Sequence, residues 1–314
     1  MSVPKLLLIA LRVGPYIPLG ALFISEAVRD IASVTVVFDV PKEEDLHGYD
    51  VVAVSASSFN YSEARRIAVS CRARNRLSVL GGIHGTFSPL EALEDNYDLV
   101  IRGEGEHAFR KLLMGDASDC CRRSGNQVLL APIHQVSPLE LPYDGRWLQR
   151  GFWGTGYESS GVKYELGPLV TSRGCPHRCV FCTVPGTHPR LRYHSLSSIE
   201  EQIISVKKQG YTGVRIYDSI FARDREHASV VAAILAKYGL VWIAETTVNA
   251  VNDDELLRHF KRSGCIKLEF GIESVSPKVL RFFRKPFDIA TATSVIRRAQ
   301  ATGIQVETYI VIGA

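Results

Sequence analysis

Short apolar runs alternate with amphipathic segments along the first 115 residues. The apolar runs are five to seven residues long and fall at 5–11, 34–40, 51–56, 77–82 and 99–103. Continuous apolar runs of this length are typical of strands buried on both faces of a parallel sheet. The segments between them repeat their apolar positions with the helical period, at 20–31, 61–74 and 105–115. The alternation predicts an α/β fold in which residues 1–115 form a doubly wound parallel sheet.

The alternation resumes at residue 167. It predicts five further strands with helices between them, at 166–174, 214–218, 241–249, 266–274 and 304–313. This order is typical of a βα barrel, in which the chemistry lies at the carboxyl ends of the strands. We expect residues 167–314 to form a partial, C-terminally truncated barrel that ends at its fifth strand. Because such a strand exposes an unpaired edge, we also expect a second chain or copy to complete the barrel.

Residues 116–166 differ from the regions on both sides. They are rich in Gly, Pro, Ser and aromatic residues and show little periodicity apart from the run QVLLAPI at 127–133. This composition predicts a linker that contains a short hairpin.

The composition limits the class of protein. Hydrophobic residues make up 46% and charged residues 22% of the chain, as in ordinary globular proteins. The net charge is +4, and the Lys and Arg residues are scattered, which gives no indication of nucleic-acid binding. No apolar run approaches the roughly 18–20 residues that a membrane helix needs. We therefore expect a cytoplasmic protein that binds neither nucleic acid nor membrane.

Three cysteines follow the first predicted barrel strand. Cys175, Cys179 and Cys182 have the spacing C-x-x-x-C-x-x-C, and no fourth cysteine lies nearby. Structural metal sites usually take four protein ligands, whereas three thiolates can hold a 4Fe–4S cluster and leave one iron open for a substrate or cofactor. A zinc site completed by His177 or His188 is an alternative, as is a chance grouping without metal.

Four more cysteines, Cys71, Cys120, Cys121 and Cys265, bring the number to seven. An odd number with uneven spacing favours thiols over disulfides. Cys120 and Cys121 lie in the polar stretch GDASDCCRRSGN, so we expect them to be surface thiols.

The cysteine motif, with Phe181 before its last cysteine, resembles that of radical S-adenosylmethionine enzymes. The segments FGIES at 270–274 and VRIYDSIF at 214–221 resemble the fourth and second barrel strands of the subgroup that has an N-terminal cobalamin-binding domain. Residues 81–113 resemble the later part of that domain. The resemblance covers residues 3–113 and 167–313, which is nearly everything except the linker.

The resemblance implies a reaction class. In this family a 4Fe–4S cluster binds S-adenosylmethionine at its open iron and cleaves it to a 5′-deoxyadenosyl radical. With cobalamin bound, the expected outcome is methylation of an unactivated carbon of a small-molecule or peptide substrate. An electron donor such as flavodoxin or ferredoxin would reduce the cluster. The alternatives are a cobalamin-independent radical rearrangement or oxidation, and an incomplete cluster-binding chain that needs a partner.

The resemblance also assigns residues. The cluster ligands are the three motif cysteines. The expected S-adenosylmethionine contacts are Phe181, Tyr217, Asp218, Glu245, Glu273, Ser274 and Arg284. The expected cobalamin contacts lie in loops after strands and are Pro18, Leu19, Gly20, Ser55, Ser57, Gly81, Gly82, His84, Gly103, Glu104 and Glu106. The D-x-H-x-x-G motif that supplies a cobalt ligand in some cobalamin domains is absent, and DLHGYD at 45–50 comes close without matching it.

Overall fold

The computed structural model of the chain describes residues 3–12, 18–148, 156–159 and 161–313. The chain divides into two compact units. Unit 1 is Met1–Ser137 with Leu141–Trp147, and unit 2 is Pro138–Glu140 with Leu148–Ala314. Within the described residues, no helix is long and apolar enough to cross a membrane.

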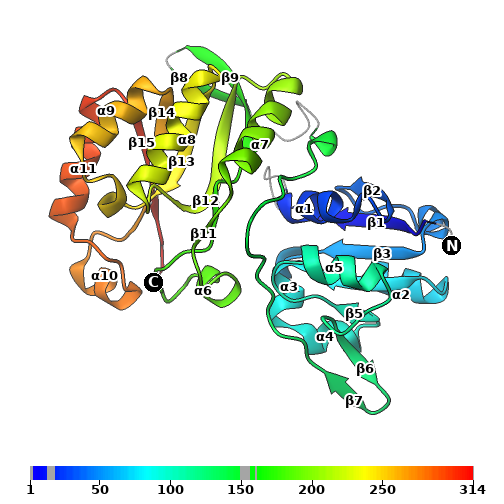
Figure 1. Ribbon diagram of the computed structural model, residues 1–314. Coiled ribbons are helices and arrows are strands. Elements are labelled where there is room, and N and C mark those ends of the chain that lie inside the picture. The colour runs from blue at the N-terminus through cyan, green and yellow to red at the C-terminus, as the bar shows by residue number, and fades with distance from the viewer. Residues whose placement is uncertain (1–2, 13–17, 149–155, 160, 314) are drawn as a thin grey trace. The chain divides into compact units, whose positions relative to one another are not determined.

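Unit 1 is built on a seven-stranded sheet with the order β2-β1-β3-β4-β5-β6-β7 (Figure 1). The first five strands are parallel, as the apolar runs predict: β1 Lys5–Ala10, β2 Ser33–Val37, β3 Val51–Ser55, β4 Leu77–Gly81 and β5 Leu99–Val100. The last two form an antiparallel hairpin, β6 Cys121–Ser124 and β7 Gln127–Leu129. This hairpin extends the sheet because β6 pairs with β5.

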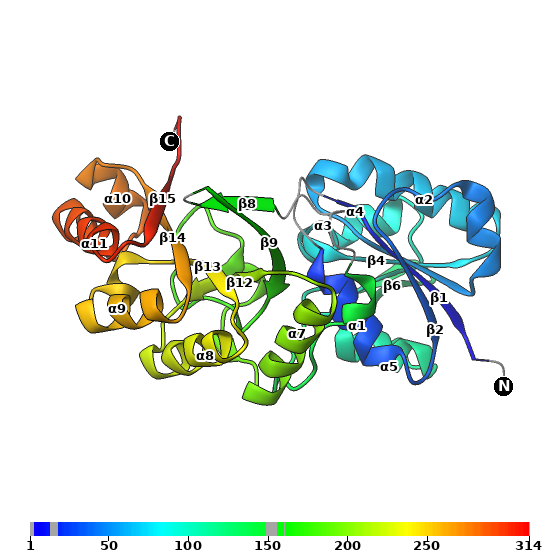
Figure 2. The same cartoon turned by 90° about the horizontal axis from the view of Figure 1, so that it is seen from above.

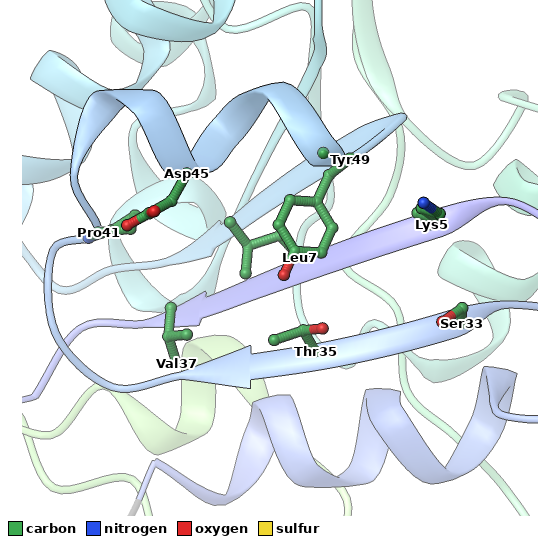
Figure 3. A pocket seen from close by; sticks show the side chains of 9 residues that line it. Lys5, Leu7, Ser33, Thr35, Val37, Pro41, Asp45 and Tyr49 are labelled. Carbon is green, nitrogen blue, oxygen red and sulfur yellow. The ribbon is translucent and has the colours of Figure 1, made fainter.

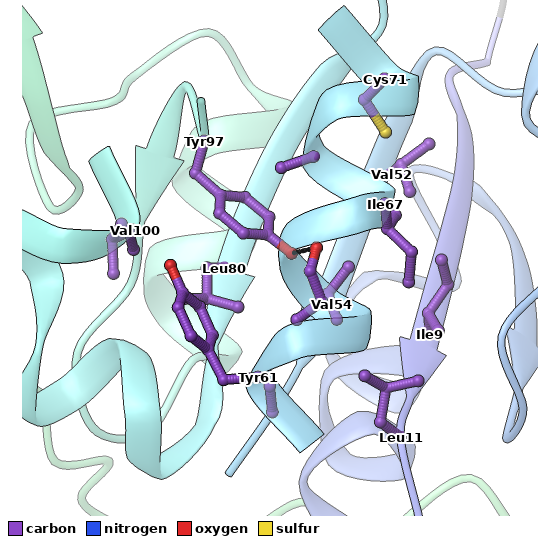
Figure 4. Packing of buried hydrophobic residues seen from close by; sticks show 14 of the residues in the cluster. Ile9, Leu11, Val52, Val54, Tyr61, Ile67, Cys71, Leu80, Tyr97 and Val100 are labelled. Atoms are coloured by element: carbon purple, nitrogen blue, oxygen red, sulfur yellow. Dashed lines mark hydrogen bonds between the residues drawn. The ribbon is translucent and has the colours of Figure 1, made fainter. Parts of the chain in front are cut away.

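Helices cover both faces of this sheet, so it is doubly wound (Figure 2). One face carries α1 Leu19–Val28 and α5 Glu106–Leu113, and the other carries α2 Tyr61–Ala73, α3 Gly82–Phe87 and α4 Pro89–Glu94. Beneath α2 a buried cluster joins the strands to the helix, and it includes Ile9, Val54 and Leu80 from the strands and Ile67 from α2 (Figure 4). The Tyr97 hydroxyl lies in this cluster and donates to the Ala64 carbonyl oxygen at 2.7 Å. Burying these apolar side chains stabilises the unit.

Two expectations for unit 1 are wrong. Cys120 and Cys121 are not surface thiols; they are 1% and 0% exposed, because Cys121 begins β6, pairs with Val100 of β5 and belongs to the buried cluster of the unit. Residues 82–87 are not a loop but the short helix α3. The polar residues around Cys120 and Cys121 hide their burial, which neighbours distant in sequence supply, and the two glycines of 82–87 hide the helix.

Gly103 has a packing role that gives a direct prediction. Its φ is +80°, and a Cβ at this position would overlap the backbone of His134. We expect Gly103→Ala to lower the free energy of unfolding by roughly 2 kcal/mol or more, since backbone strain and overlap add. Gly115 also has a positive φ, +94°, but faces open space. Gly115→Ala should therefore cost only the backbone strain, without any steric overlap. Urea denaturation measures both variants, and equal losses would show that the contact with His134 is unimportant.

A cavity of about 480 Å³ lies over β1 and β2 beside the 3₁₀ helix η1 Glu43–Gly48 (Figure 3). Its lining mixes Lys5 and Asp45 with Leu7, Val37 and Tyr49. None of the residues predicted for a functional site lines it.

Unit 2 is built on a six-stranded sheet with the order β15-β14-β13-β12-β9-β8. Five of its strands are parallel, as predicted: β9 Val162–Leu169, β12 Gly213–Phe221, β13 Val241–Thr246, β14 Cys265–Glu273 and β15 Gln305–Ile310. β8 Gly156–Ser159 pairs antiparallel with β9 at one edge. Within the part of the chain that the structure describes, β15 pairs only with β14 and forms the other edge.

Helices line the outer face of this curled sheet (Figures 1 and 2). They are α7 Leu196–Lys208, α8 Arg225–Lys237, α9 Asp254–Arg262 and α11 Ile289–Ala301, with α10 Pro277–Phe283 after β14. Trp242 on β13 packs edge-to-face on Phe221 and Phe260, with ring centroids 5.5 and 5.0 Å away. These aromatic side chains join strands to helices, so the apolar core lies on the helix side. The architecture is a partial βα barrel.

Candidate functional site

The three motif cysteines lie on one loop at the carboxyl end of β9. We call residues 174–191 the cysteine loop. A two-stranded antiparallel ribbon closes its base, because β10 Ser172–Arg173 pairs with β11 Arg192–Tyr193. Gly174 opens the loop with φ +95°, and a Cβ there would overlap the carbonyl oxygen of Arg190. A glycine is therefore required at Gly174, where the two ends of the loop approach each other closely.

The thiols of the loop are available to a ligand. Cys182 is exposed, while Cys175 and Cys179 are half-buried. The Cys182 N–H donates to the Cys179 carbonyl oxygen at 3.1 Å, which makes a turn between these two residues. Burial raises the pKa of the Cys175 thiol, and the nearby charges of Cys182 and Cys179 raise it further. The thiols are thus close enough to influence one another electrostatically.

Three cysteines on one loop match the number of protein ligands that a 4Fe–4S cluster with one open iron needs. Among the described residues, no group of three or more His, Cys, Asp or Glu side chains is placed to hold one metal ion. The zinc alternative therefore gains no support from the structure. In a 4Fe–4S cluster each cysteine binds a different iron, so the three thiolates need not converge on one point.

A cation from the β14–α11 connection faces the cysteine loop. Lys285 Nζ lies 3.0 Å from Glu273 Oε1 and 5.8 Å from the centroid of the Phe181 ring. Phe181 also packs edge-to-face on Phe283, with centroids 5.0 Å apart. A Cβ on Gly271 would lie 2.5 Å from Glu273 Oε1 and 3.1 Å from Lys285 Nζ. The glycine of FGIES therefore leaves room for this ion pair.

Glu273 and Arg284 both have left-handed backbone conformations, with φ of +65° and +59°. Glu273 is buried at the end of β14, where a non-glycine residue in this conformation is strained and often marks a functional position. Arg284 is the exposed C-terminal cap of α10. The cation beside the loop is thus Lys285, which sequence analysis missed because it could not tell which of two adjacent basic residues points inward.

Asp218 faces the base of the cysteine loop and is 3% exposed. Its Oδ1 accepts from Thr171 N at 2.7 Å, and its Oδ2 accepts from Thr171 Oγ1 at 2.5 Å and Ser172 Oγ at 2.7 Å. Burial raises the pKa of Asp218 to about 6, although these hydrogen bonds oppose the shift. Both carboxylate oxygens therefore already have protein partners.

The other predicted S-adenosylmethionine contacts lie on or after the strands. Tyr217 is half-buried in the middle of β12, Glu245 is on β13, and Ser274 follows β14. Glu245 is exposed to solvent, yet the surrounding protein desolvates its carboxyl and raises its pKa, and the charge of Glu269 adds to this effect.

A charge network that sequence analysis missed lies in the sheet beside Glu245. Glu269 on β14 is fully buried and accepts two hydrogen bonds from Arg215 on β12, at 2.7 and 2.8 Å. Lys267 Nζ lies 2.6 Å from Glu269 Oε1 and 2.6 Å from Glu307 Oε2. The Tyr309 hydroxyl donates to Glu269 Oε2 at 2.8 Å. Burial would raise the pKa of Glu269, but its partners outweigh burial and lower it.

In unit 1, the predicted cobalamin contacts lie around the carboxyl ends of β1, β3, β4 and β5. Pro18, Leu19 and Gly20 begin α1, and residues 13–17 of the same loop lie outside the described residues. Ser55 and Gly81 end β3 and β4 in the same register. Ser57 N donates to Asn60 Oδ1 at 2.8 Å, and Asn60 Nδ2 donates to the Leu11 carbonyl at 3.2 Å. These bonds fix the loop after β3 to the end of β1.

His84 and Gly82 pack against other residues of unit 1. The His84 ring is 6% exposed and stacks on Tyr61 with centroids 3.5 Å apart. Its Nδ1 lies 3.3 Å from Ser58 Oγ, and burial lowers its pKa. Gly82 has φ +84°, and a Cβ there would lie 2.6 Å from the Ala56 carbonyl oxygen. The glycine allows α3 to start against the end of β3.

Gly103, Glu104 and Glu106 lie in the connection from β5 to α5. The backbone of 102–104 bonds to that of His134, with His134 N donating to Arg102 O at 2.9 Å and Glu104 N to His134 O at 3.0 Å. The buried Glu104 carboxylate accepts from Val136 N. Glu106 is also buried, in the first turn of α5. This part of the strand-end surface is thus engaged by residues 134–136.

Exposed apolar side chains, which sequence analysis did not single out, occupy the same strand ends. Phe59 follows β3 and is 91% exposed, while Ile83 and Phe87 lie on α3 after β4 and are 48% and 49% exposed. An apolar surface at the carboxyl ends of parallel strands is typical of a ligand-binding site. Their exposure is a property of the tertiary structure, so only their place after strands could have pointed to them in the sequence.

Two family models match the chain. Residues 6–113 match the B12 binding domain, and residues 169–314 match the radical SAM superfamily, in which SAM denotes S-adenosylmethionine. The matches correspond to the sheet of unit 1 and to the partial barrel that carries the cysteine loop. The expected cofactors of these two domains are cobalamin, a 4Fe–4S cluster and S-adenosylmethionine.

The sequence identity to individual relatives is low. An uncharacterized methyltransferase of Pyrococcus horikoshii is 28% identical over 96% of this chain and 70% of its own length. Bacteriochlorophyllide d C-12(1)-methyltransferase of Chlorobaculum tepidum is 26% identical over 86% of this chain and 58% of its own length. The chain therefore spans about six to seven tenths of these relatives.

A solved structure shares the fold. The radical S-adenosylmethionine methyltransferase TsrM from Kitasatospora setae, with cobalamin and a [4Fe–4S] cluster bound, matches with a TM-score of 0.79 and 18% identity. The match covers 99% of this chain and 69% of that chain.

Proposed function

We propose that this chain, which belongs to the radical S-adenosylmethionine superfamily and carries a B12-binding domain, takes part in cobalamin-dependent methylation of an unactivated carbon. The observation that carries the proposal is the joint presence of the cysteine loop at the carboxyl end of β9 and an apolar strand-end surface on the B12-binding sheet. When bound, S-adenosylmethionine would supply a 5′-deoxyadenosyl radical and cobalamin a methyl group.

The residues of unit 2 would hold and orient the first cofactors. Cys175, Cys179 and Cys182 would bind three irons through thiolates. Phe181 offers an apolar ring on the loop itself, and Lys285 offers a cation that is held in place by Glu273. An ammonium group whose position is fixed by a carboxylate is suited to binding an anionic group of a ligand. A small reductant protein of the flavodoxin or ferredoxin type would supply the electron.

Incubation of the reconstituted protein with S-adenosylmethionine, a reductant and hydroxocobalamin tests the proposal. We expect 5′-deoxyadenosine to form and a corrin absorption band to remain with the protein after desalting. Formation of 5′-deoxyadenosine without any retained corrin would favour a radical reaction that does not need cobalamin. Absence of both would contradict the proposal.

Lys285, rather than Arg284, is expected to contribute to binding S-adenosylmethionine. The Lys285 side chain is 11% exposed and lies over Phe181, whereas Arg284 points from an exposed cap. We expect Lys285→Met to weaken S-adenosylmethionine binding about tenfold, a typical loss for one charge-assisted hydrogen bond. Arg284→Met, as the matched control, should change the dissociation constant by less than about twofold. Equilibrium dialysis against the reconstituted protein measures both, and the reverse order would return the role to Arg284.

The exposed apolar side chains after β3 and β4 are expected to support cobalamin binding. A charge at Ile83 would have to be desolvated beneath a bound corrin, so Ile83→Glu should weaken retention of hydroxocobalamin at least about tenfold. Met114→Glu places the same charge on another exposed apolar position of unit 1, since Met114 is 71% exposed. Corrin absorbance after gel filtration compares them. Equal retention by the two variants would show that cobalamin does not use this surface.

A further inference from the structure

The chain segment that leads into the cysteine loop lacks continuous strand pairing. Residues 170–172 run from the end of β9 to the first residue of β10, and we call them the root segment. All three are buried, with exposed fractions of 6%, 0% and 2%. Buried backbone groups need partners. The segment obtains most of them from the side chains of two distant elements.

Two side chains supply these partners. Gln202 on α7 is fully buried and forms a pair of hydrogen bonds with Val170, accepting from its N–H at 3.0 Å and donating to its carbonyl at 3.1 Å. Asp218 on β12 accepts from the N–H and hydroxyl of Thr171 and from the hydroxyl of Ser172. The Thr171 carbonyl accepts from His194 N at 2.9 Å, just beyond the far end of the cysteine loop.

This arrangement fixes where the cysteine loop starts. Cys175 is only three residues beyond Ser172, so a shift of the root segment moves the first thiol. Asp218 itself has no room for a ligand, because its carboxylate is enclosed and both oxygens already accept hydrogen bonds. A cluster whose ligands come from one loop requires that the loop be held in one conformation before the cofactors bind.

We propose that Asp218 and Gln202 are positioning residues that hold the root of the cysteine loop, and that Asp218 does not contact S-adenosylmethionine. The proposal replaces the role that family resemblance assigns to Asp218. It rests on the proposed function only in that the loop carries the cluster. The hydrogen bonds themselves belong to the protein without cofactors.

Substitutions at Asp218 distinguish positioning from ligand binding. An asparagine can keep all three bonds, because its amide oxygen accepts from Thr171 N and the two hydroxyls can rotate to accept from its amide nitrogen. An alanine leaves the buried N–H and hydroxyls without partners. A carboxylate that bound the ligand's ammonium group would be lost equally in both variants.

The first measurement uses metal-free protein. Arg178 and Arg190 are exposed within the cysteine loop and are sites for trypsin. We expect Asp218→Ala to raise the rate of cleavage at these sites about tenfold, since a lost buried partner shifts local opening by about this factor. Asp218→Asn should stay within about twofold of the unsubstituted protein. Because no cofactor is present, failure of the proposed methylation would not affect this result.

The second measurement uses the reconstituted, reduced protein and S-adenosylmethionine itself. We expect Asp218→Asn to keep the change in the cluster's electron paramagnetic resonance signal when S-adenosylmethionine is added. We expect Asp218→Ala to broaden the signal and to release iron to a chelator about tenfold faster. Loss of the S-adenosylmethionine response in Asp218→Asn, with normal trypsin cleavage, would overturn the proposal and make Asp218 a ligand contact.

A milder pair covers the case in which Asp218→Ala does not fold. Thr171→Ser keeps the hydroxyl that donates to Asp218, whereas Thr171→Val replaces it with a methyl group of similar size. We expect Thr171→Val, but not Thr171→Ser, to accelerate trypsin cleavage of the loop severalfold. Unchanged cleavage in Thr171→Val would also overturn the proposal.

Discussion

Replacing Cys175, Cys179 and Cys182 together with alanine will reduce the iron bound after reconstitution from about four atoms per chain to background. The broad visible absorption of the cluster will disappear with it. The physical reason is that cysteine thiolates are the ligands that hold iron–sulfur clusters, and alanine offers no replacement donor. Iron and sulfide analysis together with the absorption spectrum measures the loss.

The matched control removes the other four cysteines. Cys71, Cys120, Cys121 and Cys265 are all buried, and burial raises the pKa of Cys71 and Cys120 to about 11. Buried thiols with raised pKa values are poor ligands. A variant with alanine at these four positions should therefore still bind about four irons per chain. If the triple variant keeps a cluster and the fourfold variant loses it, the ligands have been assigned to the wrong cysteines.

Glu269→Leu is expected to cause the largest loss of stability among single substitutions in unit 2. The substitution leaves Arg215 and Lys267 beside an apolar group, with side chains that are 24% and 9% exposed. Removing one partner of a buried ion pair typically costs about 3–5 kcal/mol of unfolding free energy. Urea denaturation followed by far-UV circular dichroism measures the change in the transition of this unit.

Glu307→Gln provides the comparison within the same network. Glu307 also pairs with Lys267, but its side chain is 46% exposed, so water can replace the lost contact. We expect a loss below about 1 kcal/mol. The double variant Arg215→Met with Glu269→Leu should recover much of the loss, because it removes the unpaired buried charge. Equal losses of unfolding free energy for Glu269→Leu and Glu307→Gln would mean that the buried part of the network adds little to stability.

The same network gives a direction for the pH dependence. Because the pKa of Glu269 is lowered in the folded protein, its contribution to stability is fully present above the pKa of an unfolded glutamate, about 4.3. The contribution is lost as the pH falls through the lowered value. The difference in stability between the unsubstituted protein and Glu269→Leu should therefore shrink on acidification below pH 4.

The sequence by itself determined the fold class and the cluster motif. Continuous apolar runs and helical periodicity are local signals, and they located all ten parallel strands of the two sheets. The cysteine spacing is also local, since all three thiols lie within eight residues of one loop. The position of this loop after β9 follows from the same strand pattern.

Only the tertiary structure decided which of the remaining candidates face the loop. Lys285 and Arg284 are adjacent and both basic, but a left-handed residue turns the chain so that Lys285 meets Glu273. Asp218 is separated by 47 residues from Thr171, whose hydrogen bonds occupy its carboxylate. Gln202 carries no motif, and its pairing with Val170 follows from the packing of α7 on β9.

The glycines show the same division. The family resemblance assigned Gly82 and Gly103 to cobalamin binding, where a glycine would let the ligand approach the backbone. In the structure the close approach is made by the protein itself, by Ala56 and His134 respectively. A glycine at such a position indicates that another group comes close to the backbone. Which group it is depends on chain segments that are distant in sequence. The sequence alone therefore determined the secondary-structure elements and the three cysteines of the motif, while long-range packing decided which side chains hold the cysteine loop.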